Sequence, residues 1–374
     1  MRTLYFAHDL NDTAVARRVR MLHIGGAEVK LLGFYRGSSP APEIEGIRPI
    51  DLGQTFDGKL GQRAIQVVRR ALDAGRWQEL IRWADLLLAR NLEMTAIAHT
   101  ARVWARASVP LAYECLDIHR LSTADGVAPI LLRNMERYIL RRSTTLIVSS
   151  HRFIDEFFAR LGLLLPEVIL AENKRVLTAD AQRPKPNFVL RRPPWKIGWF
   201  GNLRCMVSFD MMVQLAQRHS GVVEFILRGY PTEELQRKIE EHLPLPNMRF
   251  EGRYEQSDLS SMYTRCDFTW AIERNPSRGK TADWVLANRL YEGGFYNVPA
   301  IALSGTASAD WLRARDTGFL PSSREDIDRF LVNLTGDQYR ALQRTAVAIP
   351  TSDLVWSAED CRDFTARLAR VACC

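Results

Sequence analysis

Three side chains that can exchange protons lie close together in the first half of the chain. Glu114, Asp117 and His119 follow the apolar segment 109–113, and a short apolar run of this kind is typical of a buried strand. A carboxylate and an imidazole at the end of a strand fit a general base with an orienting partner. The alternative interpretation is a capped loop that a salt bridge holds in place.

Glu292 is a second candidate because of its place in a predicted helix. Helical periodicity runs from Thr281 to Gly293-Gly294, where a glycine with positive φ would end the helix. A carboxylate gains nothing from the macrodipole at that end, so another group should hold it. Asn288 lies one turn earlier on the same face. Either Glu292 pairs with Arg289, or its two oxygens bind the hydroxyls of a ribose diol.

Two segments of the second half are suited to binding an anion. Gly201-Asn202-Leu203-Arg204 follows the apolar strand pattern at 196–201, where a small residue lets backbone amides approach phosphate oxygens and a guanidinium binds two of them. The basic residues Arg274, Arg278 and Lys280 precede the predicted helix at 281. We expect a phosphate or an anionic sugar there, the alternative being a mobile surface loop.

The opening of the chain predicts a β-α-β unit, with strands at 2–7 and 28–35 and a helix at 14–22. Asp9 and Asp12 follow the first strand, and Arg90 follows the buried strand at 84–89. Open α/β sheets bind ligands at the carboxyl ends of their strands. We therefore expect these three side chains to face a ligand.

Strands and helices alternate in both halves, which predicts an α/β protein with two Rossmann-like domains built on parallel sheets. We place the domains at residues 1–175 and 196–350. The intervening segment 176–195 is rich in proline and poor in apolar runs, as is typical of a linker. A C-terminal helix is predicted within 351–374.

The segment 284–302 resembles the nucleotide-sugar site of GT-B glycosyltransferases, especially the family 4-like enzymes of exopolysaccharide and lipid-linked oligosaccharide synthesis. Glu292 and Pro299 match the "lYEyla.G.Pvia" run of that family, whereas the glutamate usual eight positions upstream is here Trp284. Gly201 to Arg204 resembles the family's diphosphate loop. A further ordered match comprises Phe250, Gly252, Asp258, Leu259, Tyr263, Cys266 and Asp267.

The resemblance implies a GT-B fold, with the two Rossmann-like domains facing across a cleft and the C-terminal helix crossing back toward the first. It implies a glycosyltransferase of the hexosyltransferase type that takes a nucleotide-diphosphate sugar, with a UDP-sugar favoured. Glu292 would hold the ribose and Tyr254 the base. The remaining donor-site residues would be Asn202, Arg204, Lys280, Asn288, Arg289, Gly293 and Gly294.

The resemblance also places the acceptor on the first domain. Asp117 would take the proton of the acceptor hydroxyl if the reaction inverts, which we favour, and His119 would matter more if it retains. Glu114 belongs to the same catalytic group, and Asp9, Asp12 and Arg90 lie on the acceptor side. The scheme uses no metal and no cofactor, because cations and helix amides would stabilise the leaving diphosphate.

The charge is unevenly distributed. Up to Pro194 the chain has 29 Lys and Arg against 20 Asp and Glu, and after it 22 against 23. A basic half suggests an anionic partner on one side, such as a membrane surface or a lipid-linked saccharide acceptor. The helical segment 59–82 mixes basic and apolar residues, so it is either an ordinary surface helix or a helix with one face in a membrane interface.

The composition excludes several classes of protein. No apolar run has the length of a membrane span and no signal peptide is recognised, so we expect a cytoplasmic protein, peripheral at most at the inner face of the membrane. The six cysteines show no zinc spacing. Two alternatives stay open: a nucleotide-sugar epimerase on the same fold, and a non-catalytic nucleic-acid-binding protein that uses the basic half. We expect no nucleic acid partner, because aromatic residues do not accompany the basic ones as a nucleic-acid reader requires.

Overall fold

The computed structural model describes all residues except 57–59, 178–181, 189–190, 244, 275 and 373–374, and for 60–64, 74 and 276–278 it describes the backbone alone. The chain divides into two compact units. The first comprises Met1–Ala179 and Trp356–Cys374, and the second comprises Asp180–Val355.

The first unit is built on a seven-stranded sheet in the order β3-β2-β1-β4-β5-β6-β7, and its adjacent strands are parallel. The strand order reverses between β1 and β4, so the loops after these two strands diverge at the carboxyl edge. The strands are β1 (Arg2–Ala7), β2 (Glu28–Tyr35), β3 (Ile50–Gln54), β4 (Leu86–Arg90), β5 (Leu111–Cys115), β6 (Thr145–Val148) and β7 (Glu167–Leu170).

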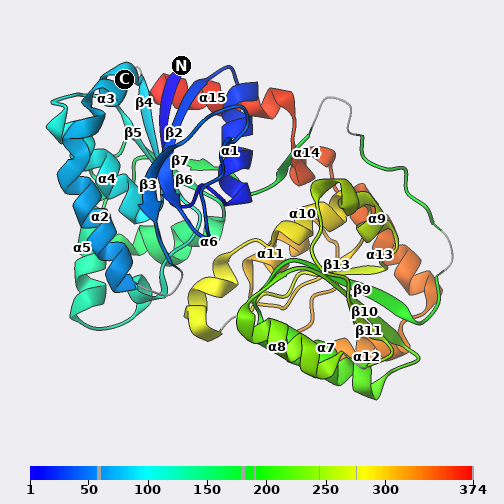
Figure 1. Cartoon of the computed structure of the whole chain (residues 1–374). Helices are drawn as coiled ribbons and strands as arrows, with labels where there is room; N and C mark the ends of the chain where they lie inside the picture. The colour runs from blue at the N-terminus through cyan, green and yellow to red at the C-terminus, as the bar shows by residue number, and fades with distance from the viewer. Residues whose placement is uncertain (57–59, 178–181, 189–190, 244, 275, 373–374) are drawn as a thin grey trace. The chain divides into compact units, whose positions relative to one another are not determined.

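Helices cover both faces of this sheet (Figure 1). On one face α1 (Thr13–Ile24) and α15 (Ala358–Ala372) pack on each other and on a core that includes Tyr5 and Leu88. The other face carries α2 (Leu60–Leu72), η1 (Asp73–Trp77), α3 (Gln78–Trp83), α4 (Asn91–Trp104) and α5 (Val127–Leu140). Smaller elements are η2 (Arg120–Thr123), α6 (His151–Phe153), η3 (Ile154–Phe158), η4 (Ala159–Leu161) and β8 (Arg175–Val176).

The second unit has a five-stranded parallel sheet in the order β11-β10-β9-β12-β13. Its strands are β9 (Trp195–Leu203), β10 (Val223–Pro231), β11 (Met248–Phe250), β12 (Phe268–Trp270) and β13 (Ala300–Ile301). Here the strand order reverses between β9 and β12. This point is the expected ligand site of the sheet.

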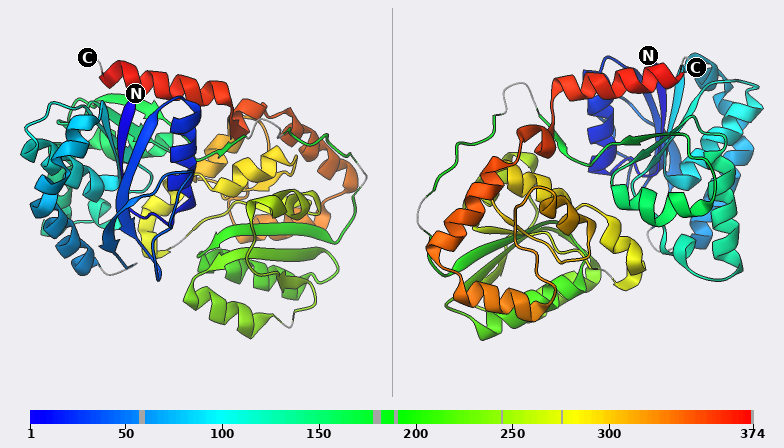
Figure 2. Two further views of the ribbon diagram at one scale, coloured as in Figure 1. Left: turned by 45° about the horizontal axis from the view of Figure 1, so that its top comes forward. Right: turned by 180° about the vertical axis from the view of Figure 1, so that it is seen from behind.

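Large aromatic side chains fill the core of the second unit. Trp195, Trp199 and Trp270 are completely buried beneath helices that Figure 2 shows from two sides. These are α7 (Met206–Arg218), α8 (Glu233–His242), α12 (Arg324–Asn333) and α13 (Gly336–Ala348). Tyr263 and Phe200 centre a smaller cluster on the opposite face. The other elements are η5 (Gln256–Asp258), α9 (Leu259–Thr264), η6 (Pro276–Trp284), α10 (Asn288–Phe295), α11 (Ala307–Arg313), α14 (Thr351–Leu354) and β14 (Val355–Trp356).

The helix predicted from Thr281 to Gly293-Gly294 is wrong at both ends. The chain forms the 3₁₀ segment η6 up to Trp284, and α10 begins at Asn288 and runs through both glycines to Phe295. The glycines serve close packing instead of ending the helix. A Cβ on Gly293 would lie 2.3 Å from Thr269 Oγ1, and one on Gly294 would lie 2.6 Å from Leu354 Cδ2.

The predicted helix at 59–82 is also corrected. Helix α2 ends at Leu72, a 3₁₀ turn follows, and α3 is a separate short helix. Lys59 lies outside the described residues. The strand β3 was not predicted, because 50–54 contains Asp51 and Gly53 and both residue types are depleted in strands.

Candidate functional site

Two paired glycines lie near the carboxyl ends of β9 and β10. Gly201 in β9 has φ of 107°, a value that favours glycine. A Cβ on the neighbouring Gly229 of β10 would lie 2.0 Å from the Gly201 carbonyl oxygen. A side chain at position 229 would therefore prevent this close approach of β9 and β10.

Two arginines and one glutamate link the elements around this edge. Glu273 follows β12, and its Oε1 accepts from Arg204 Nε at 3.1 Å while its Oε2 accepts from Arg289 Nη2 at 2.6 Å. Arg289 Nη1 also donates to the Phe200 carbonyl at 3.2 Å. Burial raises the pKa of Glu273, but the two guanidiniums outweigh burial and hold that pKa below its ordinary value.

The two arginines of this network differ in exposure. The Arg289 side chain is 6% exposed, whereas that of Arg204 is 39% exposed. Arg204 can therefore reach a ligand, and Arg289 positions the loops. The sequence left open an ion pair between Arg289 and Glu292. Among the described residues this pair is not formed, because the Arg289 guanidinium pairs with Glu273 instead.

Glu292 lies half-buried on α10, and its Oε2 accepts from the Tyr263 hydroxyl at 2.9 Å. Tyr263 is held in turn by an edge contact with Phe200 and a stacking contact with Tyr296, at centroid distances of 5.1 and 5.5 Å. Burial, followed by the charge of Glu292, raises the pKa of Tyr263 well above its ordinary value. The hydroxyl therefore keeps its proton and fixes the carboxylate.

Tyr254 and Arg289 meet at Gly201. A Cβ on Gly201 would lie 3.8 Å from the Tyr254 hydroxyl and 4.0 Å from Arg289 Nη1. Tyr254 is half-buried, and its carbonyl accepts from the Tyr230 hydroxyl at 3.2 Å. These contacts bring part of the predicted donor set together around the end of β9.

The other residues of the predicted donor set are more scattered. Asn202 is exposed after Gly201, Lys280 is exposed on η6, and Asn288 is half-buried at the start of α10. The side chain of Arg278 lies outside the described residues. Gly293 and Gly294 are buried against β12 and α14, so they position α10 and do not offer a surface to a diphosphate.

In the first unit the network around Glu114 is closed. Glu114 is completely buried, and its Oε1 accepts from Arg18 Nε at 2.7 Å and from Arg90 Nη2 at 3.1 Å. Its Oε2 accepts from Arg90 Nε at 2.9 Å and from the Tyr5 hydroxyl at 2.8 Å. Burial alone would raise the Glu114 pKa, but the two arginines lower it to about 2. Glu114 and Arg90 therefore neutralise each other beneath the surface. Arg90 Nη1 has no hydrogen-bond partner among the described residues, but it is itself buried.

Asp117 and His119 are both exposed in the loop after β5. His119 Nδ1 accepts from the Leu121 backbone amide at 3.2 Å and so caps η2. In the neutral imidazole this contact leaves the proton on Nε2. Both side chains are accessible to solvent.

Asp9 and Asp12 shape the loop after β1. Asp9 is buried, and its Oδ1 accepts from the backbone amides of Asn11 and Arg36 at 3.0 and 3.1 Å. Burial raises the Asp9 pKa above its ordinary value, although these two amides oppose the shift. Asp12 caps α1 through Ala14 N at 2.9 Å. Both side chains therefore hold the backbone of a loop at the carboxyl edge.

Glu273 and the partnership of Tyr263 with Glu292 were not predicted. Glu273 follows a buried strand, which is the criterion that selected Asp117, so the same signal was available. Tyr263 could not be matched to Glu292 from the sequence, because 29 positions separate them and the contact depends on how α9 and α10 pack.

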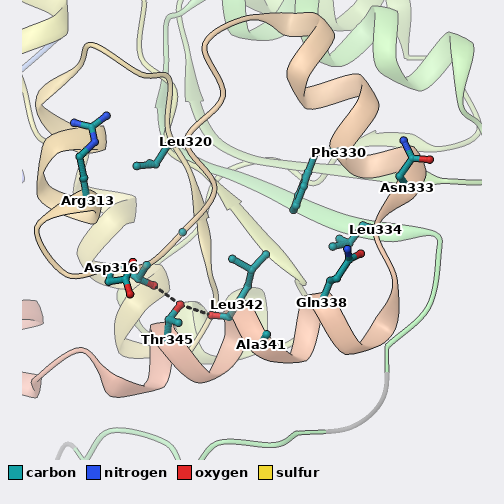
Figure 3. A pocket seen from close by; sticks show the side chains of 12 residues that line it. Arg313, Asp316, Leu320, Phe330, Asn333, Leu334, Gln338, Ala341, Leu342 and Thr345 are labelled. Carbon is teal, nitrogen blue, oxygen red and sulfur yellow. Dashed lines mark hydrogen bonds between the residues drawn. The ribbon is translucent and has the colours of Figure 1, made fainter.

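A pocket on the second unit is separate from these groups (Figure 3). None of its lining residues belongs to the predicted site. It is lined by Arg313, Asp316, Thr317, Gly318, Leu320, Phe330, Asn333, Leu334, Gln338, Ala341, Leu342 and Thr345.

The described part of the chain contains neither a cluster of metal ligands nor a membrane-spanning helix. No group of three or more His, Cys, Asp or Glu side chains there is arranged to hold a metal ion. Within the same residues, no helix combines the length and the apolar character needed to cross a membrane.

The comparisons with known proteins agree with this architecture. The chain is 36% identical to the succinoglycan biosynthesis protein ExoL of Rhizobium meliloti (strain 1021), over 99% of this chain and 93% of that protein. No family model matches.

Two solved structures show the same fold over nearly the whole chain. The Anabaena protein HepE in complex with UDP and glucose has a TM-score of 0.66 at 16% identity, covering 98% of each chain. Sucrose-phosphate synthase of Thermosynechococcus elongatus has a TM-score of 0.72 at 13% identity, covering 99% of this chain and 98% of that one. The fold is thus that of GT-B glycosyltransferases, and the recognition made from the sequence is confirmed.

Proposed function

Since the chain belongs to the family of the succinoglycan biosynthesis protein ExoL and has the GT-B fold, we propose that it transfers a sugar from a UDP-sugar to a saccharide acceptor, carried on a lipid, in polysaccharide synthesis. The donor binds at the reversal point of the second sheet. The solved complexes of HepE with UDP and with UDP-glucose support this choice of donor.

The observation that carries the proposal is the Glu292 carboxylate, half-exposed and fixed by Tyr263. Each carboxylate oxygen has more than one acceptor site, so Oε2 can keep the Tyr263 bond while both oxygens accept from the two ribose hydroxyls. Tyr254, beside Gly201, contacts the uracil. Asn288 lies one turn before Glu292 on α10 and completes the ribose side of the site.

The diphosphate lies over the end of β9 in this proposal. The backbone amides after Gly201 and the exposed guanidinium of Arg204 bind its oxygens. Asn202 and Lys280 add a polar group and a cation. As the bond from the anomeric carbon to the diphosphate breaks, negative charge grows on the leaving oxygen, and these fixed donors stabilise that charge more than they stabilise the bound donor.

Asp117 acts as the base of an inverting reaction. It takes the proton of the acceptor hydroxyl, whose oxygen attacks the anomeric carbon from the side opposite the diphosphate, and UDP departs with the bonding electron pair. His119 is the candidate if the configuration is retained. This scheme requires neither a metal nor a cofactor.

The proposal is tested by thermal shift with UDP-, GDP- and ADP-glucose on the purified full chain. We expect UDP-glucose and UDP to raise the Tm most. Glu292→Gln should reduce the shift, while Asp117→Asn should keep it and abolish UDP release in the presence of a lipid-linked saccharide fraction. A full shift in Glu292→Gln would contradict the donor site, and full turnover in Asp117→Asn would contradict the base.

A further inference from the structure

The first unit exposes apolar side chains along one side of α2. Ile65, Val68 and Leu72 are 54%, 57% and 71% exposed. Their spacing of three and then four residues places them on a single face of the helix. The solvent side of a surface helix is normally polar, whereas this face of α2 is apolar.

The same composition continues on α5. Val127, Leu131, Met135 and Tyr138 are between 46% and 75% exposed, and their helical spacing again gives one face. The end of α4 adds Trp104, with 56% of its surface exposed. Three helices of the unit thus present large apolar groups to solvent.

These helices are neighbours. Helix α4 packs against both α2 and α5, and the three lie on one side of the sheet in Figures 1 and 2. His99 Nε2 of α4 lies 3.3 Å from the Tyr138 hydroxyl, and Arg102 Nη2 donates to the Arg142 carbonyl at 3.2 Å. The contacts align α4 with α5. We call the outer side of α2, α4 and α5 the basic apolar face.

The charge on this face has one sign along two of its helices. Helix α2 has no Asp or Glu, and the one acid of α5, Glu136, is buried and accepts from the Tyr113 hydroxyl at 2.6 Å. Arg69 is exposed on α2, and Arg142 is exposed just after α5 with its guanidinium carbon 3.6 Å from the centre of the Tyr138 ring.

The second unit offers a contrast. Its exposed large apolar side chains, among the residues described, are Phe188, Tyr230 and Val332. Phe188 lies between β8 and β9, Tyr230 on β10 and Val332 on α12, so no single element carries two of them. The concentration on α2, α4 and α5 is therefore a property of this side of the first unit.

We propose that the basic apolar face binds the surface of an anionic lipid bilayer. Its apolar side chains enter the boundary between headgroups and acyl chains, and its arginines bind lipid phosphates. Because α2 and α5 carry arginines and expose no acids, their charge is complementary to the negative charge of such a bilayer. The inference deepens the proposed function by naming the surface that presents a lipid-carried acceptor, while lipid binding itself needs no donor.

The test is co-sedimentation of the full chain with vesicles of phosphatidylglycerol and phosphatidylcholine in equal amounts, and with phosphatidylcholine alone. We expect binding to the anionic vesicles that weakens with salt. The double variant Trp104→Glu, Leu131→Glu should bind at least about tenfold more weakly, because two apolar contacts are lost and two acids are added. Val332→Glu on α12 is the matched control and should bind like the natural chain.

A second variant keeps the test independent of folding. Arg141 and Arg142 are both exposed directly after α5. Arg141→Gln with Arg142→Gln should reduce binding to the anionic vesicles and make it less sensitive to salt, without changing the Tm or the shift produced by UDP. A natural chain that ignores anionic vesicles would overturn the proposal. So would a dimer in light scattering that Trp104→Glu, Leu131→Glu turns into a monomer, since a second copy would then be the partner. If UDP did not raise the Tm of the natural chain, that result would contradict the donor site and not the lipid-binding face.

Discussion

Each unit carries an acid held by two arginines at the carboxyl edge of its sheet, and the two networks differ in access. Glu114, Arg18 and Arg90 are all at most 4% exposed in their side chains. In the second unit Glu273 is also buried, but the Arg204 side chain is 39% exposed. The groups of the first network are all buried, whereas the second presents a partly exposed cation beside the backbone after Gly201.

The difference separates charges that stabilise a fold from charges that bind. Burying an ion pair costs desolvation free energy, and the attraction between the partners offsets that cost only when each charge keeps its partner. Removing one partner therefore lowers the unfolding free energy strongly. A half-exposed arginine contributes little to stability and remains able to bind an anion. Exposure, and not the presence of a charged residue at a strand end, therefore distinguishes the two edges.

The largest expected effect follows from breaking the closed network. Glu114→Gln would leave Arg18 and Arg90 buried without a counter-charge, and we expect the first unit to lose about 3–5 kcal/mol of unfolding free energy. Urea denaturation followed by circular dichroism measures it. A loss below about 1 kcal/mol, the range of an exposed pair, would show that the network is not closed. UDP should still raise the Tm of the folded Glu114→Gln variant.

A second acid of the first unit sharpens the comparison through pH. Burial raises the pKa of Glu136 from 4.5 to about 7, although the Tyr113 hydroxyl opposes the shift. Between these values the folded chain holds a proton that the unfolded chain releases. The protonated Glu136 therefore stabilises the folded chain fully below pH 4.5, and this contribution to the unfolding free energy is lost as the pH rises to about 7. The loss amounts to about 3 kcal/mol at most.

Glu136→Gln should remove that loss, because an amide does not titrate. Unfolding free energies measured at several pH values across this range, for the natural chain and the variant, test the prediction. Parallel curves for the two proteins would show that Glu136 does not titrate there.

In the second unit Glu292→Gln should weaken UDP binding by about 10- to 100-fold, because a hydrogen bond to a charged group contributes about 1.5–3 kcal/mol. The Tm without ligand should change little, since Glu292 is half-exposed. Isothermal titration calorimetry measures the Kd. Tyr263→Phe is the matched variant, and it should weaken binding less, because it frees the carboxylate without removing it.

The smallest effect on stability is expected for Arg204→Ala. Its pair with Glu273 is partly exposed and Arg289 remains, so the cost should be below about 1 kcal/mol. Affinity for UDP should nevertheless fall, and more than the affinity for uridine, because the guanidinium is assigned to the diphosphate. Equal losses for UDP and uridine would place Arg204 away from the phosphates.

Alternation of apolar runs with helical periods was sufficient to predict two parallel α/β sheets, because burial on both faces makes such strands continuous in apolar residues. The opening β-α-β unit was predicted correctly from the same alternation. The start of α10 could not be predicted this way. Trp284 and Ala287 precede α10 at helical spacing. Tertiary packing buries both side chains, although the two residues do not belong to one continuous helix.

The candidate site was only partly predictable for a similar reason. The sequence identified Glu114 and Asp117 by the same argument, yet β5 buries Glu114 and leaves Asp117 exposed in the loop that follows. Gly293-Gly294 is typical of a helix end, but close contacts with Thr269 and Leu354 use both glycines inside α10. Long-range packing decides these outcomes, and single-sequence patterns do not encode it.

The most direct test of the central claim, that the second unit binds the donor through Glu292, is a crystal structure of the chain with UDP. We predict ribose hydroxyl oxygens within about 3.2 Å of the Glu292 carboxylate, a hydrogen-bond distance, and the diphosphate beside Arg204 and the backbone after Gly201. UDP bound at the edge of the first sheet, or a Glu292 carboxylate without contact to the ribose, would contradict the account.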